Sequence, residues 1–214
     1  MPWLMRVDAS VGPHQPVDFE SAIQCYVMVR LSVELRRGSD NQAVPATLLS
    51  LTSKHIEDFT VRWRPPLEEA SQEDKYWDWH FKQRLSETRD NHETYAIECD
   101  GETQGLMALE TQQHRSVLAP SEPLVYVARL SAAPWNRRQI QDPPIFRRVG
   151  TLLLRFSRIR SLALGYKGRV GLHALPNAEG FYERRNMMRF DFSADVYVDE
   201  DEPLAYFEYP PYRR

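Results

Sequence analysis

The sequence predicts an α/β (α+β) domain with a mixed, largely antiparallel sheet of six to seven strands and helices on both faces. Three observations lead to this prediction. Apolar residues make up 42% of the 214 residues, which is enough to bury the core of a single domain over residues 1–214. Residues 1–93 carry mainly helical periodicity. Residues 94–209 alternate β-rich runs with helical segments, in the order β-β-β-α-β-α-β.

The first 93 residues are predicted to be mostly helical. Between residues 17 and 37 apolar side chains recur at helical spacing, and Gly38 follows as a stop signal. The other segments of this region are predicted to be a strand at 1–11, short helices at 46–59 and 72–89, and a loop at Pro65-Pro66.

The strongest local signal is a hairpin within residues 95–110. Two β-rich runs meet at Asp100-Gly101, and this pair suits a tight type I′ turn because both central residues need positive φ. The remaining segments are predicted to be strands at 124–132, 169–175, 196–198 and 204–209, and helices at 148–164 and 177–185.

The composition excludes several classes of protein. A formal net charge of −3 gives no general attraction to nucleic acid or to an anionic membrane. Cys25 and Cys99 are too few for a disulfide framework or a zinc site, so we expect reduced thiols and no metal. The N-terminal residues lack the apolar run of a signal peptide, and no window reaches the roughly 18 apolar residues of a membrane span. We therefore expect a cytoplasmic protein without a membrane partner.

The helix predicted at residues 148–164 begins with a candidate anion site. Gly150 lies in its first turn, where free N–H groups and the helix dipole favour an anion and glycine allows close approach. Arg147 and Arg148 bring positive charge to the same place. The segment is equally compatible with an ordinary surface helix that has a solvated basic face.

A second segment follows the strand at 169–175 and begins at Ala178. With Gly150, it resembles the coenzyme A-binding motifs of the GNAT superfamily of N-acetyltransferases. Three positions match the second motif in register: Ala178, Phe181 and Tyr182. Asn186 stands where the family has glycine, and asparagine is the best non-glycine occupant of a left-handed backbone position. Arg148 stands in the place of the middle glycine of the first motif.

The resemblance implies that the strands at 124–132 and 169–175 separate and leave room for the pantetheine arm of acetyl-coenzyme A. It implies that backbone groups of Leu130, Ser131 and Ala132 pair with this arm. Asn177 and Phe181 are expected to be further cofactor contacts. The residues implied to hold the pyrophosphate are Arg147, Arg148, Val149, Gly150 and Thr151.

The activity implied by the resemblance is acetyl transfer from acetyl-coenzyme A to a primary amine, by direct attack on the thioester. The acceptor is expected to be a small molecule or a peptide, and a homodimer is compatible with the family. Tyr182 is implied to be the general acid that protonates the leaving thiolate. A base is also needed, because an alkyl amine is mostly protonated at neutral pH. Glu110, His173 and a chain of water molecules remain open as the base.

Two alternative functions stay open. A coenzyme A-binding relative without turnover is suggested by Arg148 in place of the usual glycine. A nucleic-acid-binding module is suggested by the arginine-rich residues 137–169. We rank this second alternative lower, because few aromatic side chains accompany those arginines.

Overall fold

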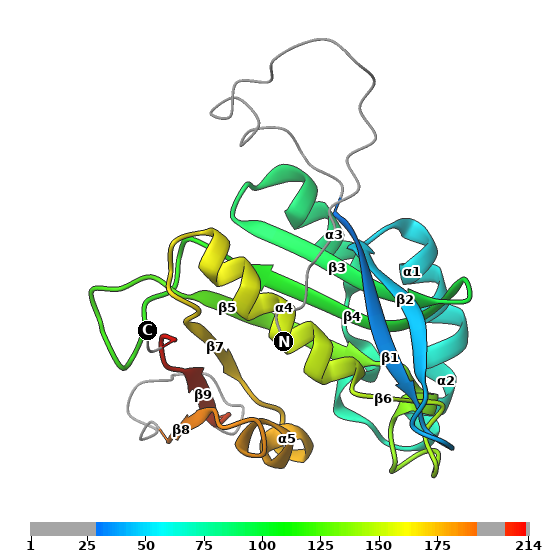
Figure 1. Cartoon of the computed structure of the whole chain (residues 1–214). Helices are drawn as coiled ribbons and strands as arrows, with labels where there is room; N and C mark the ends of the chain where they lie inside the picture. The colour runs from blue at the N-terminus through cyan, green and yellow to red at the C-terminus, as the bar shows by residue number, and fades with distance from the viewer. Residues whose placement is uncertain (1–28, 192–203, 213–214) are drawn as a thin grey trace.

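The computed structural model describes residues 29–191 and 204–212, which form one nine-stranded sheet (Figure 1). The strand order is β6-β1-β2-β3-β4-β5-β7-β9-β8, and every neighbouring pair is antiparallel except β5 and β7. The predicted strands at 1–11 and 196–198 and the start of the helix predicted at 17–37 lie outside the described residues. The strands are β1 (Arg30–Arg37), β2 (Ala43–Ser50), β3 (His92–Cys99), β4 (Glu102–Glu110), β5 (Val125–Ala132), β6 (Phe146–Arg147), β7 (Val170–His173), β8 (Met188–Phe190) and β9 (Tyr206–Tyr209).

The helical prediction is wrong for residues 30–37 and 46–50, which belong to the antiparallel strands β1 and β2. Leu31, Val33 and Leu35 recur at every second residue, which is the period of a strand. The helical prediction relied on Leu31 and Leu35, a spacing of four that fits both periods. These two strands, together with the short β6 and β8, raise the count above the predicted six to seven.

A continuous helical segment follows β2 and covers one face of the sheet. Its middle is a π-helix, in which the N–H of Arg64 donates to the carbonyl of Phe59, five residues earlier. Pro65 and Pro66 explain this geometry, because they have no N–H with which to make the usual bonds four residues back. The prediction of a loop at these prolines is wrong, since they occupy the first helical positions of α2. The parts of the segment are α1 (Ser53–Asp58), η2 (Phe59–Trp63) and α2 (Arg64–Glu69).

The helix predicted at 72–89 is divided into two pieces. A 3₁₀ turn, η3 (Glu73–Tyr76), precedes α3 (Trp79–Thr88). Asp78 separates the two pieces because it is the N-cap of α3. Its backbone is extended, and its side chain accepts the N–H of Phe81 at 2.8 Å.

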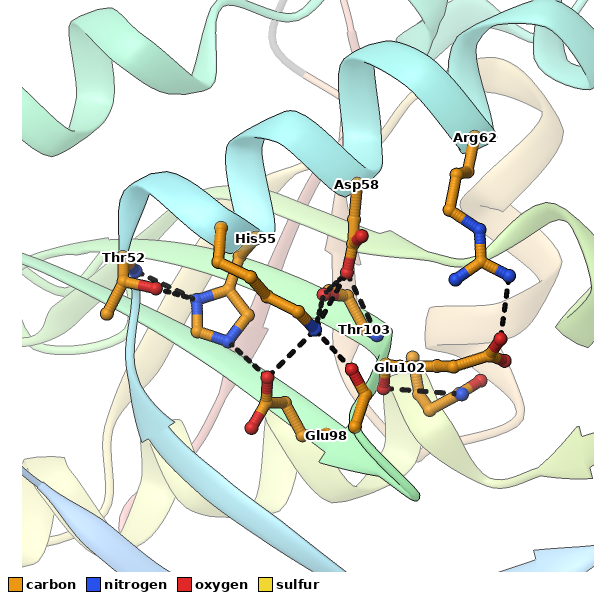
Figure 2. Close-up of polar contacts among 10 residues, drawn as sticks. Thr52, His55, Asp58, Arg62, Glu98, Glu102 and Thr103 are labelled. Carbon is orange, nitrogen blue, oxygen red and sulfur yellow. Dashed lines mark hydrogen bonds and ion pairs between the residues drawn. The ribbon is translucent and has the colours of Figure 1, made fainter.

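The hairpin predicted at Asp100-Gly101 is confirmed, with φ of 52° and 76° at these two residues. A polar cluster holds α1 against this hairpin (Figure 2). Lys54 Nζ lies 2.8 Å from Asp58 Oδ2 and 2.9 Å from Glu98 Oε1. The same Asp58 oxygen accepts hydrogen bonds from the N–H and the hydroxyl of Thr103. We call Lys54, Asp58, Glu98 and Thr103 the hairpin cluster.

Both faces of the sheet are covered, and β4 shows this most directly. Met107 and Leu109 pack into the core beneath α4 (Val149–Ala163), whereas Leu106 and Ala108 pack beneath α1, η2, α2 and α3. This alternation is what a strand buried on two sides requires. The helices predicted at 148–164 and 177–185 are confirmed as α4 and as η5 (Pro176–Ala178) with α5 (Glu179–Glu183).

Candidate functional site

The sheet opens between β5 and β7. These strands pair only at Val125 with Val170 and at Tyr126 with Gly171. On its other edge β5 stays paired with β4 as far as Ala132. The β7-facing edge of residues 127–132 therefore has no strand partner within the described part of the chain. The predicted pantetheine contacts all lie on this open stretch of β5: Leu130, Ser131 and Ala132.

The start of α4 is positioned by the two-residue strand β6. Arg147 pairs with Arg36 of β1, and the chain then turns at Arg148, which is the N-cap of α4. Arg148 has a φ of 70°, a left-handed conformation that costs a non-glycine residue roughly 1–2 kcal/mol. Arginine thus adopts here the backbone conformation that glycine favours. The N–H groups of Val149, Gly150 and Thr151 follow in the first turn, where helices have no internal acceptors.

Three buried polar side-chain atoms near this helix start have no hydrogen-bond partner: Arg147 Nε, Thr151 Oγ1 and Arg185 Nε. Arg185 belongs to the same area, since its guanidinium lies 5.2 Å from the ring centre of Phe181, which reaches Gly150. A buried donor without a partner costs about 1–3 kcal/mol. Phosphate oxygens accept several such bonds at once, so these residues fit the pyrophosphate of coenzyme A.

Residues from three elements meet at Gly150. A Cβ placed there would lie 3.3 Å from Phe181 Cζ of α5 and 3.5 Å from Leu130 Cδ2 of β5. On the inner side of the helix, a Cβ at Gly105 of β4 would lie only 2.6 Å from Val149 Cγ1. Glycine at position 105 therefore lets the first turn of α4 approach the sheet closely.

Tyr182, the predicted general acid, lies on α5 and is 6% exposed. Its ring centre lies 5.6 Å from that of Phe207 on β9. Burial raises the pKa of Tyr182 well above its usual value, and the charges of Asp74 and Tyr126 raise it further. Asp74 touches β5, and Tyr126 is the last β5 residue paired with β7, so both mark the opening. Tyr182 therefore keeps its proton at neutral pH and can act as a hydrogen-bond donor.

The turn η3 reaches both sides of the opening. Asp74 Oδ2 accepts a hydrogen bond from Ser131 Oγ at 2.6 Å, and Arg137 binds both Asp74 oxygens, at 2.9 and 2.5 Å. Glu73 Oε2 accepts the backbone N–H of Asn177 at 3.3 Å. Burial alone would raise the pKa of Asp74, but the hydrogen bonds from Arg137 and Ser131 outweigh burial and hold this pKa below its usual value. Sequence reasoning missed Asp74 and Glu73, because no local pattern reports contacts over 63 or 104 residues.

The two predicted base candidates, His173 and Glu110, lie at the ends of one chain of contacts. His173 Nδ1 lies 2.8 Å from the hydroxyl oxygen of Tyr126. The Tyr126 ring stacks on the His114 ring, with ring centres 4.2 Å apart. His114 Nε2 in turn lies 2.8 Å from Glu110 Oε2. This bond and Lys82 outweigh burial and lower the pKa of Glu110 to about 2, so it is a weak base. Burial lowers the pKa of His173, with a smaller effect of the His114 charge, which keeps His173 neutral at neutral pH.

Several arginines of the region 137–169 are engaged inside the protein, which weakens the nucleic-acid alternative. Arg158 stacks on Tyr212 with its guanidinium 3.7 Å from the ring centre. Three others form ion pairs: Arg137 with Asp74, Arg160 with Glu93 and Arg169 with Glu122.

Within residues 29–191 and 204–212, no group of three or more histidine, cysteine, aspartate or glutamate side chains is placed to hold a metal ion. None of the helices there combines the length and the apolar composition that crossing a membrane requires.

Comparisons with known proteins give a match in structure. No family model matches the sequence, and no curated protein matches it either. The GNAT domain of S. lividans PAT superposes with a TM-score of 0.55 at 13% identity, covering 84% of this chain and 96% of that one. PaiA N-acetyltransferase from Thermoplasma acidophilum, solved with coenzyme A, superposes with a TM-score of 0.52 at 11% identity, covering 78% and 99%. At these identities the comparisons establish the fold.

Proposed function

We propose that this chain, which has the GNAT fold, is an N-acetyltransferase that uses acetyl-coenzyme A and acts on a primary amine of a small molecule or peptide. One observation carries the proposal: the open edge of β5 adjoins a helix start where Arg147, Thr151 and Arg185 have buried polar atoms without partners. The coenzyme A complex of PaiA supports it, because the two proteins share this fold.

The cosubstrate supplies a thioester, whose carbonyl an amine attacks directly and whose sulfur leaves as a thiolate. Arg147 and Arg148 and the first N–H groups of α4 would hold its pyrophosphate. Backbone groups of β5 at Leu130, Ser131 and Ala132 would pair with its pantetheine arm and polarise the carbonyl. Phe181 of α5 and Asn177 of η5 would be further contacts of the cosubstrate.

Two side chains of the segment from β7 to α5 suit the proton transfers. His173 is neutral and is oriented by Tyr126, so it would accept a proton from the incoming amine. Tyr182 keeps its proton and lies beside the opening, so it would donate to the leaving sulfur. Glu110 would instead keep His114 in place beneath Tyr126.

Binding of coenzyme A without turnover is the second candidate function. Arg148 favours it, because this residue carries a side chain at a left-handed backbone position where the motif has glycine. A free-thiol release assay with acetyl-coenzyme A and a panel of amines and peptides separates the two. Amine-dependent thiol release supports the transferase. Binding without thiol release across the panel supports the second candidate, and absence of any binding to coenzyme A contradicts both.

A further inference from the structure

A pocket of about 430 Å³ lies where η2 meets the segment that joins η3 to α3. Its buried wall consists of apolar and aromatic side chains, each at most 2% exposed: Ile56, Phe59 and Trp79. The rest of the lining is more exposed and mostly polar or aromatic: Thr60, Arg64, Tyr76, Trp77, Asp78 and His80.

The hydrogen-bonding groups of this pocket are unbalanced. Trp79 Nε1 and Arg64 Nε are both buried and have no partner, and both can only donate. Arg64 forms no ion pair with any described residue, and its guanidinium lies 6.0 Å from the ring centre of Phe59. Asp78 also lines the pocket, but its Oδ1 accepts the N–H of Phe81 at the start of α3, and it is not the partner of either buried donor. The two buried donors, Arg64 Nε and Trp79 Nε1, therefore lack an acceptor.

The backbone around the pocket gives a second reason to expect a ligand. Phe59 and Arg64 are the two ends of the π-helical turn, which is imposed by Pro65 and Pro66. Single π-turns within α-helices are frequent at functional sites. Here the turn places the unpaired Arg64 donor and the Phe59 ring in the lining of one pocket.

We propose that this pocket binds a flat aromatic ring that carries a carboxylate. The aromatic walls formed by Phe59, Trp77 and Trp79 would contact the ring. The carboxylate would accept hydrogen bonds from Arg64 and from Trp79 Nε1, which supplies the partners that both donors lack. Trp77 is already held in position by Arg129, whose guanidinium lies 4.9 Å from its ring centre. The proposal rests on the lining of this pocket and its unpaired donors, and it does not require the acetyl-transfer proposal.

The test is a titration of the full chain with 2-naphthoate, followed through the indole N–H signals of its five tryptophans by NMR. The Trp79 signal, assigned with Trp79→Phe, is expected to move downfield as its N–H gains an acceptor. Two tryptophans are internal controls. Trp135 Nε1 already donates to Gln104 Oε1 at 2.9 Å, and Trp63 lies outside the pocket lining.

Two comparisons make the test selective. Cyclohexanecarboxylate lacks the flat ring and naphthalene-2-carboxamide lacks the charge, so both are expected to bind at least about tenfold more weakly. Arg64→Met is expected to weaken 2-naphthoate by a similar factor. Arg62→Met, on the same helical segment but paired with Glu102 outside the pocket, is expected to leave it unchanged.

The proposal is overturned if the Trp79 signal does not respond to millimolar 2-naphthoate, or if the Trp63 and Trp135 signals move equally. Equal binding by the parent and a folded Arg64→Met variant would overturn it as well. Should Arg64→Met fail to fold, the titration of the parent with the three probes still decides the matter.

Discussion

Two polar regions of this molecule differ in how their hydrogen-bonding groups are satisfied. In the hairpin cluster, Lys54 contacts both carboxylates, and Asp58 also accepts two bonds from Thr103. At the start of α4, buried polar atoms of Arg147 and Thr151 stay unpaired. Unpaired buried donors persist where a ligand supplies the partner, because otherwise they only cost stability. In this comparison the internally paired groups stabilise the fold, whereas the unpaired groups at the start of α4 are the ones that a bound ligand could pair with.

The largest effect is expected from Tyr182→Phe, at the edge of the unpaired region. The change removes the hydroxyl and keeps nearly all the buried ring. We expect kcat to fall by roughly 10²- to 10⁴-fold, the usual range for one acid–base group, while acetyl-coenzyme A binding and the melting temperature are kept. Steady-state kinetics with a verified acceptor measure this. A parental kcat would show that Tyr182 is not the general acid.

Gly150→Glu is expected to abolish coenzyme A binding while the protein stays folded. The new carboxylate would lie close to Phe181, Leu130 and the first N–H groups of α4. The helix start tolerates this negative charge, but the carboxylate would repel phosphate. In the parent, ligand at about 100 times Kd should add roughly 2.7 kcal/mol to stability, and the variant should lose this gain. Thermal shift measures both. Leu162→Glu, near the other end of α4, is the control and should keep the ligand-induced shift.

Asp58→Asn tests the hairpin cluster and should show the opposite behaviour. We expect a loss of about 1.5–3 kcal/mol of stability at neutral pH, because the bonds to Lys54 and Thr103 lose their charge. Coenzyme A binding should not change. Denaturant unfolding with and without the ligand measures both quantities. Reduced coenzyme A affinity at unchanged stability would contradict the division between the two regions.

The same variant gives a pH dependence. Burial would raise the pKa of Asp58, but hydrogen bonds from Lys54 and Thr103 outweigh it and hold the pKa below its usual value. A carboxyl with a depressed pKa in the folded state stabilises above its ordinary value near 3.9, and this contribution is lost as pH falls through the folded-state pKa. The stability difference between parent and Asp58→Asn should therefore narrow in acid. A stability difference that stays constant while the pH falls from about 4 through the folded-state pKa would contradict this assignment.

The smallest effect concerns Arg148, where backbone and side chain can be separated. Arg148→Gly should raise stability by up to about 1 kcal/mol, because glycine adopts the positive φ without strain. Arg148→Ala keeps the strained backbone and should give no gain. Both variants should bind coenzyme A more weakly if the guanidinium contacts phosphate. Equal affinity in parent and both variants would mean that Arg148 only faces solvent.

The elements that the sequence predicted well are those with local signals. Asp100-Gly101 fixes its own turn, and α4 ends its apolar stripe before Gly165. Asn186 has a φ of 59°, in the left-handed region that its motif position calls for. β1 could not be separated from a helix, because Leu31 and Leu35 satisfy both periods and its strand partner lies further along the chain.

The candidate site was predictable only in part, for the same reason. Gly150 and Tyr182 belong to motifs of a few residues, so the sequence could single them out, and Gly150 lies against Leu130 of the open β5 edge. Asp74 and the contacts of His173 depend on pairings between distant segments. Such pairings arise from the sheet order, which no local pattern encodes.

The glycine at position 105 has a consequence for the size of the molecule that this fold can accept. Gly105 lies on β4, which forms neither the open edge of β5 nor the start of α4. Its missing side chain nevertheless fixes how far Val149 and Leu153 sink toward the sheet, since a methyl there would come within 2.6 and 3.1 Å of them. Adding that methyl would lift the helix, and so lengthen the distance between the first amides of α4, which are proposed to hold the phosphates, and the thioester end. Through these contacts a residue of β4 would set the length of linker that fits between the two ends of the proposed site.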